Sequence, residues 1–119
     1  MREKKFSLPK RKRLTRSMEF GQVKKQGRVY RGRLFTLSVM PVETGGFRVG
    51  FITSRKLGQA TRRNRVRRRL REIVRRHQHT LTGNAWFVII ARSGAVKASY
   101  AELEAEWLRL APCAFILAP

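Results

Sequence analysis

Residues 61–78 combine one apolar stripe with a cationic surface. Val66, Leu70, Ile73 and Val74 recur at the spacing of an amphipathic helix. Most of the other positions are arginines, and the segment contains a single acidic residue, Glu72. The arginines are Arg62, Arg63, Arg65, Arg67, Arg68, Arg69, Arg71, Arg75 and Arg76. Such a helix must bury its stripe against a core while its like charges repel one another on the outside. The chain therefore has to build a compact body on one side of this helix and leave the other side cationic.

The whole chain repeats this charge imbalance. Its 119 residues include 28 Lys and Arg against 7 acidic residues, which gives a net charge of +21. A solvated surface usually mixes signs, whereas a surface of one sign gains from a polyanion that exchanges its condensed counterions for the protein. Nucleic acid is the predicted partner. An anionic membrane is the rival, but no window approaches the roughly 18 apolar residues of a membrane span.

We divide the chain into a basic N-terminal arm (1–16), one domain (17–110) and a C-terminal tail (111–119). The arm contains Pro9 and has no helical stripe, so it is either a solvated tail or a contact for nucleic acid. It also lacks the apolar run of a secretory signal. The single cysteine, Cys113, excludes a disulfide within the chain. Both features favour a cytoplasmic location.

The pattern of helices and strands predicts an α+β fold. Ser17 is expected to cap a helix that runs to about residue 26 and stops at Gly27. Alternating residues at 33–40 and 47–54 flank turn residues at 43–46, which predicts an antiparallel hairpin, with a further short strand around residues 29–30. The apolar run at 85–91 predicts an interior strand at the centre of the sheet. Ser99 and Glu102 form a capping box that opens a closing helix to residue 110.

The residues that usually carry catalysis or bind metals are scarce. The chain has no Asp, and its seven Glu are not paired in any evident pocket. His77 and His79 are two residues apart on a helix, so they point in different directions, and one cysteine does not complete a zinc site. We therefore predict no catalytic residue and no metal ligand, which leaves binding as the expected chemistry.

The predicted helix at 61–78 presents its ligand face opposite the apolar stripe. At 100° per residue, this face carries Asn64, Arg65, Arg68, Arg71 and Arg75. The planar guanidinium group binds phosphate with two parallel hydrogen bonds and stacks on bases. We expect these residues to touch nucleic acid most directly.

Residues 48–72 resemble the signature segment of the bacterial ribonuclease P protein family, centred on Arg63, Asn64 and Arg65. Weaker matches extend the resemblance over residues 14–110: Leu14, Met18, Glu19, Phe20, Gly27, Arg33, Phe35 and Ile89 to Arg92. The resemblance implies a single-domain α-β-β-β-α-β-α two-layer sandwich with a left-handed βαβ crossover.

The resemblance also implies a division of labour in transfer RNA maturation. In the family a large RNA is the catalyst, and the protein binds this RNA and holds the single-stranded 5′ leader of precursor tRNA between the first helix and the sheet. Mg²⁺ would be held chiefly by the RNA, and the isolated protein would be inactive. Nothing in the sequence indicates a protein partner.

Carried over position by position, the residues that would face the catalytic RNA are Arg55, Lys56, Arg63, Asn64, Arg65, Arg67, Arg68 and Arg71. Phe20 and Phe35 would belong to the leader cleft. Lys24 and Ser38 stand where some members carry aromatic residues, so leader contact is expected to be more electrostatic here. Two alternatives share the charge: a ribosomal protein that binds ribosomal RNA, and a nuclease that acts without RNA.

Overall fold

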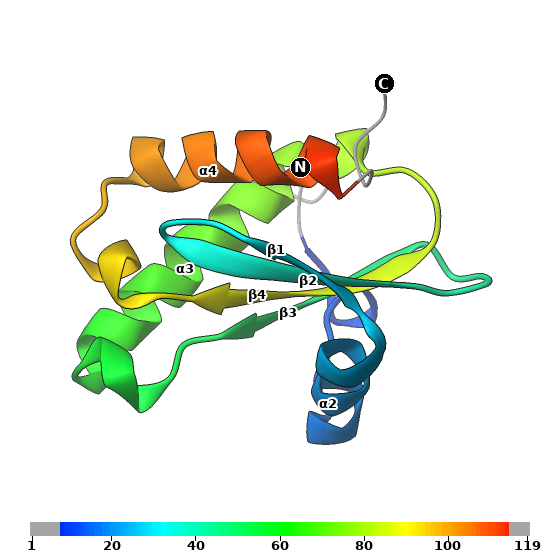
Figure 1. Ribbon diagram of the computed structural model, residues 1–119, viewed down its shortest axis with the longest axis horizontal. Coiled ribbons are helices and arrows are strands. Elements are labelled where there is room, and N and C mark those ends of the chain that lie inside the picture. The colour runs from blue at the N-terminus through cyan, green and yellow to red at the C-terminus, as the bar shows by residue number, and fades with distance from the viewer. Residues whose placement is uncertain (1–7, 115–119) are drawn as a thin grey trace.

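The computed structural model describes residues 8–114. It contains α2 (Ser17–Gln26), β1 (Arg28–Arg31), β2 (Phe35–Pro41), β3 (Phe47–Ile52), α3 (Ala60–His77), β4 (Ala85–Ala91) and α4 (Tyr100–Cys113), with short 3₁₀ turns η1 (Lys10–Lys12), η2 (Arg55–Leu57), η3 (Gln78–Thr80) and η4 (Ser93–Val96). The predicted α+β class and order of elements are confirmed, the short strand β1 included (Figure 1). No helix within residues 8–114 is long and apolar enough to cross a membrane.

The four strands form one sheet in the order β1-β2-β4-β3. β4 is antiparallel to β2 and parallel to β3, so β3, α3 and β4 form the predicted crossover. The interior position of β4 is confirmed.

The predicted β2–β3 hairpin is wrong, because β4 lies between these two strands. The glycine turn does reverse the chain, with Gly45 at φ 98° and Gly46 at φ 71°. It is wide because it passes around the start of β4: the Asn84 side chain accepts from the Gly46 N–H (2.7 Å) and donates to the Glu43 carbonyl (3.1 Å). The central place goes to β4 because its apolar run is buried from both sides there.

The two faces of the sheet are covered unequally. α3 and α4 lie over one face, and the ten-residue α2 stands on the other (Figure 1). The predicted α3 stripe is fully buried in the core beneath α3 and α4. On the other face a smaller apolar cluster, which includes Val23, Met40 and Val88, joins α2 to the sheet.

The two outer helices begin with different caps. Ser17 was expected to cap α2, but it is the first helical residue, and Arg16 occupies the cap position. The Glu19 side chain reaches back and accepts hydrogen bonds from the N–H groups of Thr15 and Arg16, both at 3.1 Å. The Ser99–Glu102 capping box of α4 is confirmed. α4 ends three residues later than expected, at Cys113 rather than 110, since burial of Ala111 and Ala114 continues its contact with the core.

The described part of the arm packs on the sheet. Leu8 and Leu14 are buried, and Arg13 forms a parallel bridge with Val49 on the outer edge of β3. Residues 8–14 therefore cover that edge. Residues 1–7 and 115–119 of the predicted arm and tail lie outside the described residues.

Candidate nucleic-acid interface

The outward face of α3 carries the predicted basic surface. Asn64, Arg65, Arg68 and Arg71 are exposed, because the buried stripe turns the opposite side of the helix to solvent. Arg75 differs from them: its Nε and Nη2 atoms donate to Glu72, at 2.9 and 2.5 Å. The continuous cationic surface therefore comes from the first three turns of the helix.

Four side chains of α3 surround a hollow of about 160 Å³: Asn64, Arg67, Arg68 and Arg71. Arg67 is fixed at its rim, since it donates to Asn64 Oδ1 (3.1 Å) and to Thr53 Oγ1 (2.5 Å). Partial burial, and then repulsion from Arg13, Arg67 and Arg68, lowers the pKa of Arg71. None of the ion pairs within residues 8–114 includes Arg67, Arg68 or Arg71. An anion in this hollow would relieve the repulsion.

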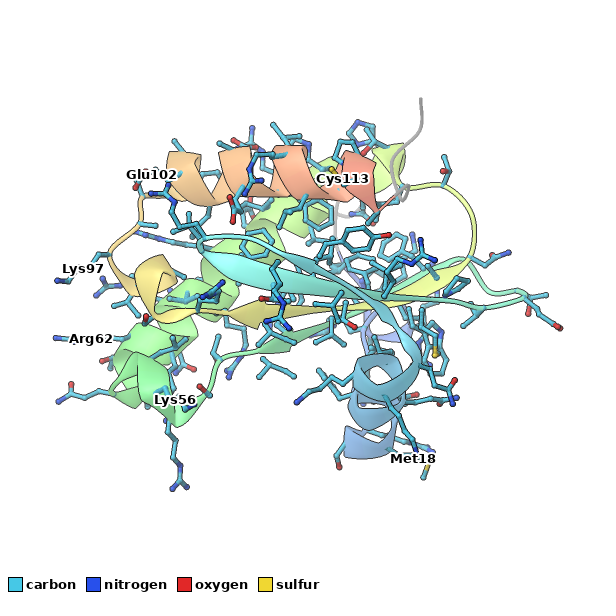
Figure 2. The ribbon with its side chains drawn as sticks, viewed as in Figure 1. Met18, Lys56, Arg62, Lys97, Glu102 and Cys113 are labelled. Carbon is cyan, nitrogen blue, oxygen red and sulfur yellow. The ribbon has the colours of Figure 1, made fainter. Side chains whose placement is uncertain are left out.

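The remaining predicted RNA contacts lie beside this surface. Arg55 and Lys56 are exposed in η2, immediately before α3, and Figure 2 shows Lys56 projecting from the same end of the molecule as Arg62. Arg63 is half-buried, and its Nε is buried without a hydrogen-bond partner in the described chain. Arg63 is thus less open to a ligand than its neighbours.

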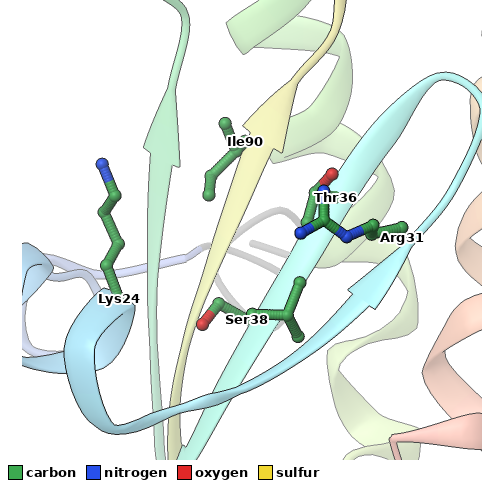
Figure 3. A pocket seen from close by; sticks show the side chains of 6 residues that line it. Lys24, Arg31, Thr36, Ser38 and Ile90 are labelled. Carbon is green, nitrogen blue, oxygen red and sulfur yellow. The ribbon is translucent and has the colours of Figure 1, made fainter.

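A second hollow, of about 260 Å³, lies on the α2 face of the sheet. Lys24 of α2 and Arg31 of β1 border it, with Ile90 and Ser38 of the central strands between them (Figure 3). Val29 and Thr36 complete the lining. Two cations border the hollow, and Ile90 and Val29 make part of its lining apolar. The Ser38 hydroxyl is buried and donates to the Val23 carbonyl at 3.2 Å.

Phe20 lies on the sheet side of α2. Its half-buried ring covers Gly50 so closely that a Cβ at that position would lie 2.4 Å from Phe20 Cε2. The ring also packs with the apolar cluster under α2. The structure thus places Phe20 on the same sheet face as the hollow, with part of its ring open to solvent.

Phe35, by contrast, does not belong to this cleft. Its side chain is fully buried on the opposite face, in the core beneath α3 and α4. Strand alternation is the reason, since Phe35 shares its face with Leu37 and Val39 while Thr36 and Ser38 face α2. The same alternation identifies lining residues that the sequence prediction missed: Arg31, Thr36 and Ile90.

Five of the six described carboxylates serve structural contacts. Glu19 pairs with Arg48 (3.0 Å), Glu72 with Arg75, and Glu104 with His77 (2.7 Å), while Glu102 caps α4. Glu106 is buried and accepts from the Leu34 N–H (3.1 Å) and from Arg109 (2.6 Å). Within residues 8–114 no three His, Cys or Glu side chains form a group that could hold a metal ion.

Comparison with known sequences identifies related proteins. The sequence model of the Ribonuclease P family matches residues 8–114. The chain is 41% identical over 99 residues to the ribonuclease P protein component of Chloroflexus aggregans, which covers 82% of this chain and 73% of that protein. It is 35% identical over 98 residues to the component from Streptococcus pneumoniae, which covers 82% and 80%.

Solved structures share the fold. The RNase P protein of Staphylococcus aureus matches 89% of this chain and 97% of its own with a TM-score of 0.82 at 24% identity. The RNase P protein of Thermotoga maritima matches 82% and 93% with a TM-score of 0.75 at 26% identity. The first is a likeness of fold alone, and the second adds modest sequence similarity over the same arrangement.

Proposed function

Since this chain belongs to the ribonuclease P protein family, we propose that it binds the catalytic RNA of ribonuclease P through α3 and the 5′ leader of precursor tRNA beside α2. In this role it assists removal of the leader and hence maturation of the tRNA 5′ end. The exposed cationic face of α3 is the observation that carries the proposal.

The α3 face suits a folded RNA. Arg65, Arg68 and Arg71 are exposed on a rigid helix, so their guanidinium groups meet phosphates with little loss of conformational freedom. Phosphate contacts supply affinity and fix orientation without reading sequence. A protein that holds one particular large RNA therefore needs this surface to match the shape of the RNA.

The hollow beside α2 suits the leader. Lys24 and Arg31 offer charge to two neighbouring phosphates, and the Phe20 ring offers a surface for base stacking. Ser38 and Thr36 have small side chains in the lining, which leaves room for the strand. Leader binding would thus depend on charge at least as much as on stacking.

Catalysis is assigned to the RNA, and Mg²⁺ is proposed to be held chiefly by the RNA. The described carboxylates do not fit a metal cage, because they are dispersed and engaged in caps and ion pairs. Arginine stays protonated at neutral pH and cannot act as a general base. A cytoplasmic location, expected from the sequence, remains a prediction.

The first test compares Arg68→Gln with Arg109→Gln in binding to the catalytic RNA. Both changes remove one positive charge, but Arg109 lies on α4 and pairs with Glu106. We expect Arg68→Gln to weaken binding clearly more than Arg109→Gln. If about six phosphates are neutralised, the wild-type affinity should fall about 10³-fold between 50 and 200 mM salt. Equal effects of the two variants, or a flat salt response, would reject the α3 interface.

A second test separates this proposal from a ribosomal protein and from a protein nuclease. Precursor tRNA is incubated with RNA-free protein, with the catalytic RNA in high Mg²⁺, and with both. We expect no cleavage by the protein alone and efficient cleavage with both at low Mg²⁺. Cleavage by RNA-free protein that is lost in a His77→Ala, His79→Ala variant would make the protein the enzyme, and co-purification with ribosomal RNA alone would favour a ribosomal role.

A further inference from the structure

The N-terminal arm is held firmly where it passes the edge of β3. Arg13 forms its bridge with Val49, and the Leu14 N–H donates to the Val49 carbonyl at 2.8 Å. From the other side, Arg48 Nη2 donates to the Arg13 carbonyl at 3.3 Å. Leu8 and Leu14 are buried on either side of this point, at 9% and 5% exposure. The backbone of Arg13 is therefore fixed before any ligand binds.

Arg13 docks on the stretch of β3 that α3 runs along. Arg67 donates to Thr53 just past the end of β3, and α3 runs back along this strand. Arg71, one turn farther on, therefore lies toward the Val49 position where Arg13 is held.

The Arg13 side chain is half-buried, and its Nε is buried without a hydrogen-bond partner in residues 8–114. Its charge reaches Arg71 and, after the larger effect of partial burial, contributes to the lowered pKa of that residue. None of the ion pairs in the described chain includes Arg13. Lys12, next to it, lies instead over the Phe47 ring, 5.1 Å from its centroid.

Two segments far apart in the sequence thus place like charges together. Arg13 from the arm and Arg71 from α3 approach the same stretch of β3, and Arg67 and Arg68 line the hollow beside Arg71. A folded protein does not gain from such a meeting, because unpaired cations that are partly removed from water raise its free energy. The arrangement becomes favourable when an anion lies between them.

We propose that Arg13 and Arg71 bind one backbone phosphate of the catalytic RNA between them, so that the docked arm is part of the RNA interface. This inference rests on the proposed function of the α3 face. Two guanidinium forks that approach from different elements can grip the oxygens of one phosphate from two sides, which fixes its position more tightly than one helix alone. Arg65 and Arg68, exposed earlier on α3, supply the neighbouring contacts that a polynucleotide needs and a single small anion does not.

The alternative occupant is a carboxylate from an acidic protein segment. The uniform charge of the adjoining α3 face favours RNA, since a protein partner would have to present a run of acidic residues with the spacing of phosphates. Competition distinguishes them: poly-glutamate should compete poorly with the catalytic RNA at equal charge concentration. Efficient competition that depends on Arg13 would overturn the assignment to RNA.

A double-mutant cycle tests the shared phosphate. Arg13→Gln, Arg71→Gln and the double variant are titrated with the catalytic RNA at fixed salt. Because both residues hold the same group, we expect the loss in the double variant to be smaller than the product of the single losses by about 3-fold or more. Arg11→Gln is the matched control: it removes the same charge from an exposed position two residues away, and its loss should multiply with that of Arg71→Gln.

The folded state supplies an independent check. If Arg13 serves only the fold, Arg13→Gln should lower the melting temperature of the RNA-free protein. We expect a melting temperature equal to or above that of the wild type, because the change removes a repulsion. Arg13→Lys keeps the charge but loses the fork, and it should recover only part of the affinity.

The outcomes separate two failures. Wild-type protein that does not bind the catalytic RNA would overturn the proposed function and this inference together. Two outcomes would overturn the shared phosphate alone, with wild-type binding intact. In one, the losses in affinity for Arg13→Gln and Arg71→Gln simply multiply in the double variant. In the other, the Arg13→Gln protein is destabilised but its RNA affinity is unchanged.

Discussion

The two faces of the sheet are built from the same strands but differ in how completely helices cover them. On the α3 and α4 face, Phe35, Leu37, Phe87 and Trp107 are at most 1% exposed. On the α2 face, alternate residues of the same strands meet a single short helix, and Ile90 remains partly open beside a hollow. The difference shows that the larger core lies on one face, whereas the other face has a smaller apolar cluster and keeps an open hollow beside it.

Substitution of Phe87 should give the largest effect on stability. Phe87 packs against Trp107, with ring centroids 5.8 Å apart, and Phe87→Ala would leave a cavity in the closed core. We expect a loss of about 3–5 kcal/mol in the free energy of unfolding. Ile90→Ala on the open face should cost about 2 kcal/mol or less, since part of that side chain is already in contact with water. Urea unfolding of both variants measures the difference, and equal losses would erase the contrast between the faces.

Substitution of Phe20 should change binding more than stability. If its ring stacks on a leader base, Phe20→Ala should weaken binding of precursor tRNA by about 1–3 kcal/mol and leave mature tRNA unaffected. Phe35→Leu is the matched control on the closed face, and it should lower the melting temperature without changing the preference for a leader. A Phe20→Ala protein that no longer melts cooperatively would show that the ring belongs to the core.

The smallest expected effect is a difference between the two faces in how their carboxylates make folding stability depend on pH. Burial raises the pKa of Glu106, but hydrogen bonds from Arg109 and from the Leu34 N–H outweigh it and lower the pKa below its ordinary 4.5. A carboxyl group whose pKa is lower in the folded state stabilises it above the unfolded pKa, and this contribution disappears as the pH falls through the folded pKa. We expect Glu106→Gln to cost about 1.5 kcal/mol at neutral pH, and less as the pH falls below about 4.5.

Glu19 provides the comparison on the open face. Its pKa is also lowered, because hydrogen bonds from the Arg16 and Thr15 N–H groups and the charge of Arg48 outweigh burial. Glu19 is more exposed than Glu106, with 16% against 6% of the side chain accessible, so Glu19→Gln should show the same trend with a smaller amplitude. If the stability lost in Glu19→Gln changed more with pH than the stability lost in Glu106→Gln, the expected ranking of the two faces would be reversed.

The features that the sequence predicted well were periodic ones. The stripe of Val66 and Leu70 and the run at 85–91 identify α3 and β4, because each pattern reflects which side chains are buried in the core. The Arg surface follows from the same stripe, since the positions opposite a buried face must be outside. Arg65, Arg68 and Arg71 are therefore exposed on the outward side of α3, whereas Arg55 and Lys56 lie in η2 before it. Their roles in RNA binding stay predictions.

The features that failed depend on contacts between distant segments. Turn residues near Gly45 report that the chain reverses, but not that another strand will fill the gap, so the hairpin was mispaired. Phe35 was assigned by resemblance, although its alternation with Leu37 already placed it in the core. The docking of Arg13 on β3 had no local signal, because the two leucines that anchor the arm are surrounded by charged residues.

The place of β4 in the sheet also constrains the order in which the molecule can assemble. β4 is the last strand in the chain, yet β2 and β3 are joined only through it. Until residues 85–91 have left the ribosome, a growing chain holds a β1–β2 ribbon and a β3–α3 segment with no sheet to connect them. Most native strand pairing therefore waits until β4 has been synthesised, and the long sequence separation between partners slows the search for the fold. The protein is thus expected to fold in one late step, with α4 closing the core almost as soon as the strand that completes the sheet is released.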